Sequence, residues 1–372
     1  MEELNRYQKK LEDLSNAFNL RVLPEGHAAN LINLCSNDYL GLNSDNGLLD
    51  EFLSGTSSNA HRFSSCSSRL QSGNFTECTM LENLIARSYG TEACLLYNSG
   101  YNANIGIISS LAGKSDLIVA DKLVHASIID GVKLCPATFM RFRHLDYSHL
   151  EKLLMKHRNQ YGNVFIISES IFSMDGDCTD LQQLVELKKK YNCFLYIDEA
   201  HSFGVRGQLG LGCAEEQEVI KEIDFIIGTF GKALASLGAF VVCNNLFKQY
   251  LVNHSRSLIY TTALPPLNLA WTRFLFEKLP EFHPEREKLK LVSTQFARLL
   301  DTKPQSHIIP FVIGTNQKTV AASLKLKLHG FNVLPVRYPT VPEGTARLRF
   351  SLSADMSIDQ LMPIKNILKS DE

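Results

Sequence analysis

The chain contains six short apolar runs, each too brief for a buried helix, and segments with helical spacing separate most of them. A strand that is apolar on both sides has to be covered on both faces, so this alternation predicts a mostly parallel sheet between helical layers. We therefore expect an α/β fold with functional groups beyond the carboxyl ends of its strands. The runs are CLLY at 94–97, LIVA at 117–120, VFII at 164–167, FLYI at 194–197, FII at 225–227 and FVV at 240–242.

The length of 372 residues predicts more than one domain. We expect an N-terminal helix and strand segment over 1–45, a large α/β domain over 46–245 and a smaller α+β domain over 246–372. Outside the runs, the spacing predicts helices over about 3–19, 76–90, 267–278 and 284–300. It also predicts a strand entering a polar turn over 31–42, strands around 308–313 and 346–351, and a serine-rich loop over 61–74.

Charge and cysteine content argue against several classes of protein. The 38 basic and 39 acidic residues give a net charge of −1, which argues against nucleic acid or an anionic membrane as the main partner. The nine cysteines never form C-x-x-C, so we expect neither a disulfide framework nor a metal site. This cysteine usage favours a protein of the reducing cytoplasm. The longest uncharged stretch, at 93–113, is rich in Asn, Ser and Gly and is not expected to span a membrane.

Two charged residues follow buried runs. Asp198 ends the run at 194–197, and Lys232 follows the run at 225–227 within GTFGKA. A charge at the end of a buried strand is costly unless it meets a partner, and an acid with a lysine suits pyridoxal phosphate, a cationic aromatic cofactor held covalently. Lys232 could instead be a surface lysine or part of a P-loop. The P-loop pattern fails because Ile226 and Ala233 replace its first glycine and its Ser/Thr. A Schiff-base lysine is therefore the best interpretation.

Other polar residues follow the same predicted strands. His201, three residues after Asp198, could bond the phenolic oxygen of the cofactor, although D-x-x-H alone is a weak signal. His125 alone would more often be a capping or core histidine. Small donors near strand ends could together bind a phosphate group, although turns use them routinely. These donors are Gly100, Tyr101, Ser173 and Thr229.

Seven segments, in order across nearly the whole chain, resemble the α-oxoamine synthases. This family consists of pyridoxal-phosphate enzymes, and the resemblance implies the type I fold of aspartate aminotransferase and an acyltransferase activity. The segments are SNDYLGL (36–42), NSGYNAN (98–104), HASIIDG (125–131), ESIFSMDGD (169–177), DEAHSFGVRGQLGLG (198–212), GTFGKALASLGA (228–239) and PTVPEGTARLRFSLSA (339–354).

The resemblance also implies a role for each matching position. Lys232 would hold the cofactor covalently and move the α-proton of the substrate. Asp198 would pair with the pyridine nitrogen and His201 with the phenolic oxygen, while His125 would cover the ring and approach the substrate. Residues lining the cofactor and its phosphate would be Gly100, Tyr101, Ser173 and Thr229, with Thr262 from the second chain of a homodimer. Substrate contacts would come from Asn37 and Arg349 for the amino acid, and from Arg21 and Thr340 near the acyl chain.

The implied reaction is the decarboxylative condensation of L-alanine with a pimeloyl thioester, pimeloyl-CoA or pimeloyl-ACP, in biotin biosynthesis. A sister acyltransferase that uses glycine remains an alternative, because one methyl group discriminates by only ~1–3 kcal/mol. An ordinary aminotransferase and a catalytically silent partner subunit are further alternatives, although silent subunits lack the lysine. Two departures, FSSCSSR at 63–69 in place of a glycine-rich loop and Cys78 in place of a histidine, fall where the family contacts its partner subunit or acyl donor.

Overall fold

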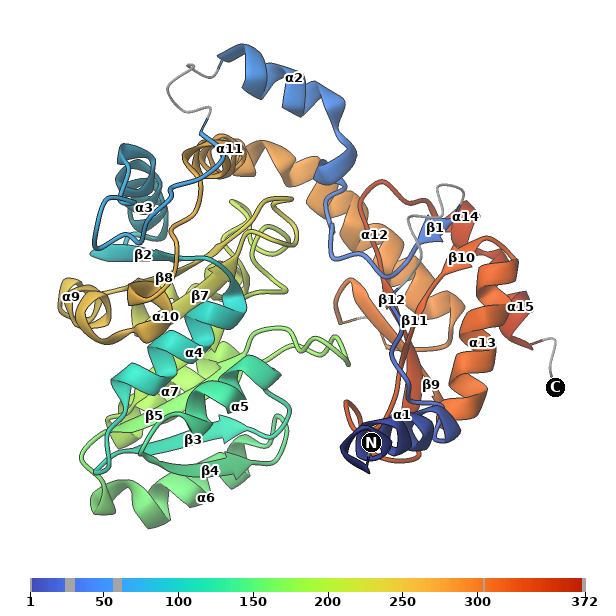
Figure 1. Cartoon of the computed structure of the whole chain (residues 1–372), viewed down its shortest axis with the longest axis horizontal. Coiled ribbons are helices and arrows are strands. Elements are labelled where there is room, and N and C mark those ends of the chain that lie inside the picture. The colour runs from blue at the N-terminus through green and yellow to red at the C-terminus, as the bar shows by residue number, and fades with distance from the viewer. Residues whose placement is uncertain (1, 24–30, 56–61, 304, 370–372) are drawn as a thin grey trace. The chain divides into compact units, whose positions relative to one another are not determined.

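The computed structural model describes residues 2–23, 31–55, 62–303 and 305–369. They form two compact units, drawn from the amino terminus in blue to the carboxyl terminus in red in Figure 1. The larger unit contains Leu40–Phe172 and Cys178–Arg286. The smaller unit contains Met1–Tyr39, Ser173–Asp177 and Glu287–Glu372. The three-part division expected from the sequence stays a prediction.

The larger unit is built on one seven-stranded sheet with the order β2-β8-β7-β6-β5-β3-β4. Only β8 runs antiparallel to its neighbours, so the other six strands end at the same edge. This is the mostly parallel sheet that the apolar runs predict. The strands are β2 (Ala93–Tyr97), β3 (Leu117–Asp121), β4 (Thr138–Phe142), β5 (Val164–Glu169), β6 (Phe194–Asp198), β7 (Phe225–Thr229) and β8 (Ala239–Cys243).

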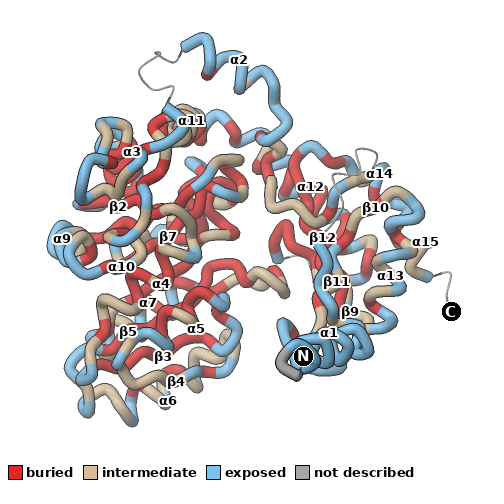
Figure 2. Tube along the Cα trace, viewed as in Figure 1, coloured by how far each residue is buried: buried red, intermediate tan, exposed pale blue. Residues whose placement is uncertain are grey.

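Helices cover the sheet, and the strands are buried along most of their length (Figure 2). Alternate strand residues, such as Ile118, Phe165 and Tyr196, form one core with helices α4 and α5. The helices of this unit are α2 (Asn46–Gly55), α3 (Thr76–Tyr89), α4 (Gly100–Leu111), α5 (Ala126–Lys133), α6 (Tyr147–His157), α7 (Leu181–Tyr191), α8 (Cys213–Glu216), α9 (Asn245–His254), α10 (Arg256–Ile259) and α11 (Pro266–Glu277). Its 3₁₀ turns are η1 (Leu42–Ser44), η3 (Arg158–Gln160), η4 (Ile220–Glu222) and η5 (Leu279–Phe282).

The smaller unit contains a three-stranded antiparallel sheet, β11-β12-β9, and a short parallel pair, β1 with β10. Its strands are β1 (Ile32–Asn33), β9 (Ile308–Gly314), β10 (Phe331–Asn332), β11 (Leu334–Val336) and β12 (Ala346–Ser351). Its helices are α1 (Glu2–Asn16), α12 (His283–Leu299, which begins in the larger unit), α13 (Asn316–Leu328), α14 (Ile358–Leu361) and α15 (Pro363–Lys369).

The strand entering a polar turn that is expected over 31–42 agrees with the structure, in which Ile32–Asn33 pair as a strand and bends and turns follow. Local side chains take the next main-chain donors: Asn33 Oδ1 accepts from the Cys35 N–H at 3.1 Å, and Ser36 Oγ accepts from the Asp38 N–H at 3.0 Å. Such bonds compete with a strand ladder, so the chain turns instead.

In the described ranges, no helix combines the length and the apolar character needed to cross a membrane. Within the same residues, no group of three His, Cys, Asp or Glu side chains is placed to hold a metal ion. All nine cysteines are free thiols.

Candidate active site

Three of the predicted residues meet at the carboxyl edge of the large sheet. Asp198 is the last residue of β6, and Lys232 follows the adjacent strand β7. The Nζ atom of Lys232 lies 2.7 Å from Nε2 of His201. An ammonium group can only donate, so the ring nitrogen of His201 accepts this bond. The edge therefore presents a lysine, a histidine and an acid at or just beyond the ends of two neighbouring strands.

The turn that carries Lys232 is tightly held. The N–H of Phe230 donates to the Gly238 carbonyl at 2.9 Å, and the N–H of Ser236 returns to the Phe230 carbonyl at 2.9 Å. The indole N–H of Trp271 donates to the Ala235 carbonyl at 3.1 Å. These bonds fix the direction in which the lysine leaves the strand.

Asp198 is buried beside a second carboxyl group. Its Oδ1 accepts from the Ala200 N–H at 2.9 Å, and its Oδ2 accepts from Nδ2 of Asn104 at 2.7 Å. Glu169 is the residue paired with it on β5. Burial first, and then the charge of Asp198, raises the pKa of Glu169 well above its ordinary value, although Lys232 opposes this. The raised pKa of Glu169 favours its protonated form beside Asp198.

His125 caps the amino terminus of α5. Its Nδ1 accepts from the Ser127 N–H at 3.2 Å, and its own N–H donates to Oε1 of Glu169 at 2.5 Å. Burial, reinforced by the charge of Lys232, lowers the pKa of His125 against the opposing effect of Asp198. The lowered pKa favours a neutral imidazole at this edge, and the role of covering an aromatic ring stays a prediction.

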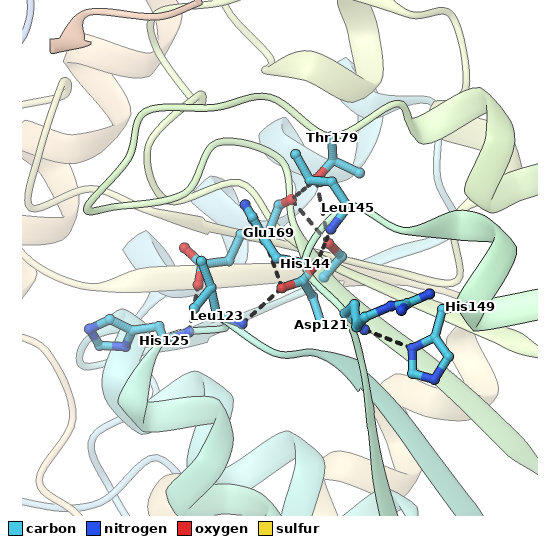
Figure 3. Close-up of polar contacts among 10 residues, drawn as sticks. Asp121, Leu123, His125, His144, Leu145, His149, Glu169 and Thr179 are labelled. Carbon is cyan, nitrogen blue, oxygen red and sulfur yellow. Dashed lines mark hydrogen bonds and ion pairs between the residues drawn. The ribbon is translucent and has the colours of Figure 1, made fainter. Parts of the chain in front are cut away.

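The carboxylate of Asp121 supports the turn that leads to His125, as Figure 3 shows. Asp121, at the end of β3, is completely buried, and its Oδ1 accepts from the Leu123 N–H at 2.8 Å and faces Nδ1 of His144 at 2.9 Å. Its Oδ2 accepts from the Leu145 N–H at 2.9 Å. The turn between β3 and α5 is thus held by Asp121 before His125 and by Glu169 at His125 itself.

The amino terminus of α4 provides donors suited to a phosphate group. Ser99 caps the helix by accepting from the Asn102 N–H at 3.1 Å. Among the hydrogen bonds of the described residues, the N–H groups of Gly100 and Tyr101 have no acceptor, as expected in a first helical turn. A Cβ on Gly100 would lie 3.6 Å from Cβ of Thr229, so the hydroxyl at the end of β7 adjoins this helix. A helix amino terminus beside a hydroxyl favours an anion.

The serine-rich loop is anchored to the rest of the larger unit. Ser65 Oγ donates to the Ala263 carbonyl at 2.7 Å, and Nη1 of Arg69 forms an ion pair with the buried Glu82 at 2.5 Å. Cys78, the second departure from the family pattern, is buried in α3, and burial raises the pKa of its thiol. Thr262 is next to Ala263, which this loop contacts, and its carbonyl accepts from Nδ2 of Asn98 at 2.7 Å. Asn98 immediately precedes the turn into α4.

The other predicted residues belong to the smaller unit, where Arg349 on β12 organises a polar group. Its Nε donates to the Ser173 carbonyl at 2.5 Å, and its Nη2 donates to Oδ1 of Asn37 at 3.3 Å. The same amide oxygen accepts from the Tyr39 hydroxyl at 2.9 Å. Because the oxygen of Asn37 faces both donors, its NH₂ group points elsewhere. A buried guanidinium beside an amide donor suits a carboxylate.

Arg21 and Thr340 lie near an arginine that sequence reasoning missed. Nη1 of Arg337 donates to the Phe18 carbonyl at 2.7 Å, and the Thr340 N–H donates to the Arg337 carbonyl at 2.9 Å. Burial, and then the charge of Arg21, lowers the pKa of Arg337. Two like charges that interact in this way create a positive region next to Thr340.

Sequence reasoning also missed Asn104 and Glu169, which contact Asp198 and His125. Asn104 lies four residues after Gly100, one turn along α4, but the local sequence does not indicate its partners. Glu169 is the last residue of β5 and is visible in the sequence as a charge that ends an apolar run.

The profile of the family aminotransferase class I and II matches residues 29–364. The chain therefore belongs to this family, and within it to the α-oxoamine synthases, as the sequence predicts. The chain is 47% identical to a protein of Haemophilus influenzae, with 96% of this chain and 98% of that protein covered. It is also 47% identical to one of Glaesserella parasuis, with 98% and 100% covered. Both carry the name "Putative 8-amino-7-oxononanoate synthase".

Solved structures confirm the predicted fold class of pyridoxal-phosphate-dependent transferases. Serine palmitoyltransferase from Sphingomonas wittichii superposes with a TM-score of 0.84 at 31% identity, covering 91% of this chain and 86% of that one. The 8-amino-7-oxononanoate synthase from Francisella tularensis superposes with a TM-score of 0.77 at 30% identity, covering 92% and 97%.

Proposed function

We propose that this protein condenses L-alanine with a pimeloyl thioester to form 8-amino-7-oxononanoate, CO₂ and the free thiol of the carrier, a step of biotin biosynthesis. The observation that carries the proposal is the contact between Lys232 and His201 beside the buried charge of Asp198. The names of the relatives point to the same product. The cofactor is pyridoxal phosphate, and a related solved structure is described as SPT with PLP.

The residues at the carboxyl edge fit this cofactor. Each oxygen of Asp198 accepts one hydrogen bond from the protein, and a carboxylate can accept more, so it can also take a pyridinium N–H. The N–H groups of Gly100 and Tyr101 with the hydroxyl of Thr229 would hold the phosphate, and Lys232 would form the covalent bond. When bound, the cofactor supplies an electron sink for negative charge on the α-carbon of the amino acid.

The chain's own groups would then bind the substrates and move the protons. Arg349 would hold the carboxylate of alanine, and the amine of Lys232 would remove the α-proton through Nζ. The α-carbon attacks the thioester carbonyl, and the thiolate leaves. The β-keto carboxylate loses CO₂, and Lys232 returns a proton to the α-carbon. His201, in contact with Nζ, keeps the amine oriented during both transfers.

Mass spectrometry of the product tests the proposal directly. Purified protein given alanine and pimeloyl-CoA is expected to release a compound with the mass of 8-amino-7-oxononanoate and one equivalent of CO₂. The sister activity is tested in parallel with glycine and acetyl-CoA. Product from that pair alone would overturn the proposal. Conversion of the bound cofactor to its pyridoxamine form, reversed by a second amino acid, would indicate an aminotransferase instead.

The positive region near Thr340 would favour binding of an acyl chain that ends in a carboxylate, as the pimeloyl group does. We expect Arg337→Ala to raise the KM for pimeloyl-CoA by about 10-fold, the equivalent of one lost hydrogen bond between charged groups. Heptanoyl-CoA has the same chain length without the second carboxylate and is the matched control, so its KM is expected to stay unchanged. Equal effects on the two thioesters would remove this support for a dicarboxylic acyl donor.

Arg349 is expected to control the affinity for the amino acid. Arg349→Lys keeps a charge but loses the planar fork that binds a carboxylate through two N–H groups. The KM for alanine is expected to rise by roughly 10- to 100-fold while the absorption spectrum of the bound cofactor is retained. Steady-state kinetics with saturating thioester measures the change. An unchanged KM for alanine would show that another residue binds the carboxylate.

We also propose a homodimer with shared active sites, in which Thr262 of one chain contacts the phosphate in the other. Chains with Lys232→Ala and chains with Thr262→Ala are each expected to have little activity. After subunit exchange, each heterodimer would contain one site with both lesions and one intact site, so each heterodimer should have about half of the wild-type activity and a fully exchanged equal mixture roughly a quarter. Confirmed exchange without recovered activity would show that each chain builds its own site.

A further inference from the structure

Asn104 connects two residues of the cofactor site through a single buried amide. Only 1% of its surface is exposed. Its Nδ2 donates to Oδ2 of Asp198 at 2.7 Å and to Oγ of Ser127 at 2.9 Å. Its Oδ1 accepts from the hydroxyl of Tyr196 at 2.5 Å. Both N–H bonds and the carbonyl oxygen therefore have partners inside the core of the larger unit.

The chemistry of these partners fixes the orientation of the amide. The carboxylate of Asp198 only accepts hydrogen bonds, so the NH₂ group of Asn104 has to face it. The opposite orientation would place the amide oxygen against the carboxylate and would leave the hydroxyl of Tyr196 without an acceptor. Burial raises the pKa of Tyr196 well above its ordinary value, and this hydroxyl remains a donor.

The orientation of the amide sets the direction of the next hydrogen bond. Oγ of Ser127 accepts from Asn104 and lies 2.7 Å from Nδ1 of His125; because that nitrogen already accepts from a main-chain N–H, the hydroxyl proton of Ser127 points to it. The main-chain N–H of Ser127 donates to the same Nδ1 at 3.2 Å. A nitrogen that receives two donors carries a lone pair and no proton. The proton of the neutral imidazole is therefore on Nε2.

We propose that Asn104 is a positioning residue that joins the carboxylate of Asp198 to the ring of His125 and holds His125 in the tautomer protonated at Nε2. The inference rests on the proposed function only in treating these two residues as the groups that hold and cover the cofactor. The two would then keep a fixed relation to each other, because one rigid amide bonds to both sides. Nε2–H is the donor that His125 offers beyond this network.

Protonation of His125 at Nδ1 would break the hydrogen bond from the Ser127 N–H and would force the Ser127 hydroxyl to turn its proton away, so these contacts favour the neutral ring. The charged groups that act on the ring are Asp198, Lys232 and Asp130. Burial lowers the pKa of His125 most strongly, and Lys232 acts in the same direction, while the two carboxylates oppose it. The hydrogen bonds from Ser127 favour the neutral ring together with burial.

Nuclear magnetic resonance of ¹⁵N-histidine-labelled holoenzyme tests the tautomer, with the signals of His125 assigned from their loss in His125→Gln. Between pH of about 6 and 8, Nε2 of His125 is expected to be protonated and Nδ1 unprotonated. A proton on Nδ1 in the wild-type protein would overturn the inference.

Two variants test the link through Asn104. Ser127→Ala removes the hydroxyl donor to Nδ1 without a change in charge. Asn104→Asp keeps the shape of the side chain but leaves no donor for Ser127, whose hydroxyl then turns to the new oxygen. Both variants are expected to raise the ionisation midpoint of His125 by about one pH unit, because its neutral form loses a hydrogen bond. An unchanged midpoint in both would show that the link is absent.

Tyr196→Phe is the matched control, since it removes the donor to the carbonyl oxygen of Asn104 and leaves both N–H bonds in place. The signals of His125 are expected to stay as in the wild type. If Asn104→Asp does not fold, as judged by thermal unfolding, Ser127→Ala with this control still decides the question. A product assay on the same samples separates the two proposals: an active wild-type enzyme with a proton on Nδ1 refutes only the inference, and an inactive one with the inferred tautomer refutes only the proposed function.

Discussion

Replacing Lys232 by alanine is expected to abolish covalent attachment of the cofactor and to lower the rate of condensation by at least roughly 10⁴-fold. The lysine is the proposed nucleophile and the proposed base, so one substitution removes both functions. Lys232 follows β7 and contacts His201, so its amine lies at the carboxyl edge of the sheet, where the cofactor is proposed to bind. The measurement is borohydride reduction of the holoenzyme followed by digestion and mass spectrometry of the labelled peptide.

The matched control is Lys221→Ala, which changes an exposed lysine in the turn η4. This variant is expected to keep the label and the activity of the wild type. A label on any lysine other than Lys232 would overturn the assignment, whatever the activity of the variant.

Asp198→Asn is expected to leave the cofactor bound but to slow the exchange of the α-proton of alanine by roughly 10³- to 10⁴-fold. The cofactor withdraws electrons best while its ring nitrogen is protonated, and an amide does not hold that proton as a carboxylate does. The neighbouring acid, Glu169, is poorly suited to replace the lost charge, because burial raises its pKa. Loss of the α-proton signal of alanine in deuterated water measures the exchange.

The control for this variant lies at the opposite edge of the same sheet. Asp224 precedes β7, and its Oδ2 accepts from the Leu195 N–H at 2.7 Å. Asp224→Asn carries the same change away from the site and is expected to exchange at the wild-type rate. Exchange at the normal rate in Asp198→Asn would show that this carboxylate has another task.

The strands of the larger unit could be predicted because they are buried on both faces. The six apolar runs match six of the seven strands to within two residues at each end. The missed strand, β4, has the sequence TFMRF, lies at the edge of the sheet and is mostly only half-buried. A half-exposed edge strand carries no continuous apolar run, so its sequence lacks the signal that identified the others.

The candidate site divides in the same way between what a sequence shows and what only a fold decides. Asp198 and Lys232 were predictable because a charge that ends an apolar run stands out along the chain. Asn104 was not, since its contacts with Asp198 and Ser127 come from the packing of α4 against β6 and α5. An asparagine within a helix gives no local indication of such partners. Arg337 was missed for a similar reason, because Arg21 is distant in sequence.

The smaller unit contains both the first and the last segments of the chain, so it can be completed only after the larger unit has been synthesised. Residues 40–286 contain the whole larger unit with only Ser173–Asp177 interrupting it, whereas the smaller unit also needs Glu287–Glu372. During synthesis on the ribosome, Ile32 therefore cannot pair with its strand partner Phe331 until most of the chain has emerged. Contacts so distant in sequence form slowly. In refolding followed by pulsed hydrogen exchange, we expect β6 and β7 to be protected before β1 and β10, and simultaneous protection would contradict this order. The amino-terminal segment is thus the part of the nascent chain that stays without its partners longest. It therefore depends longest on shielding by chaperones.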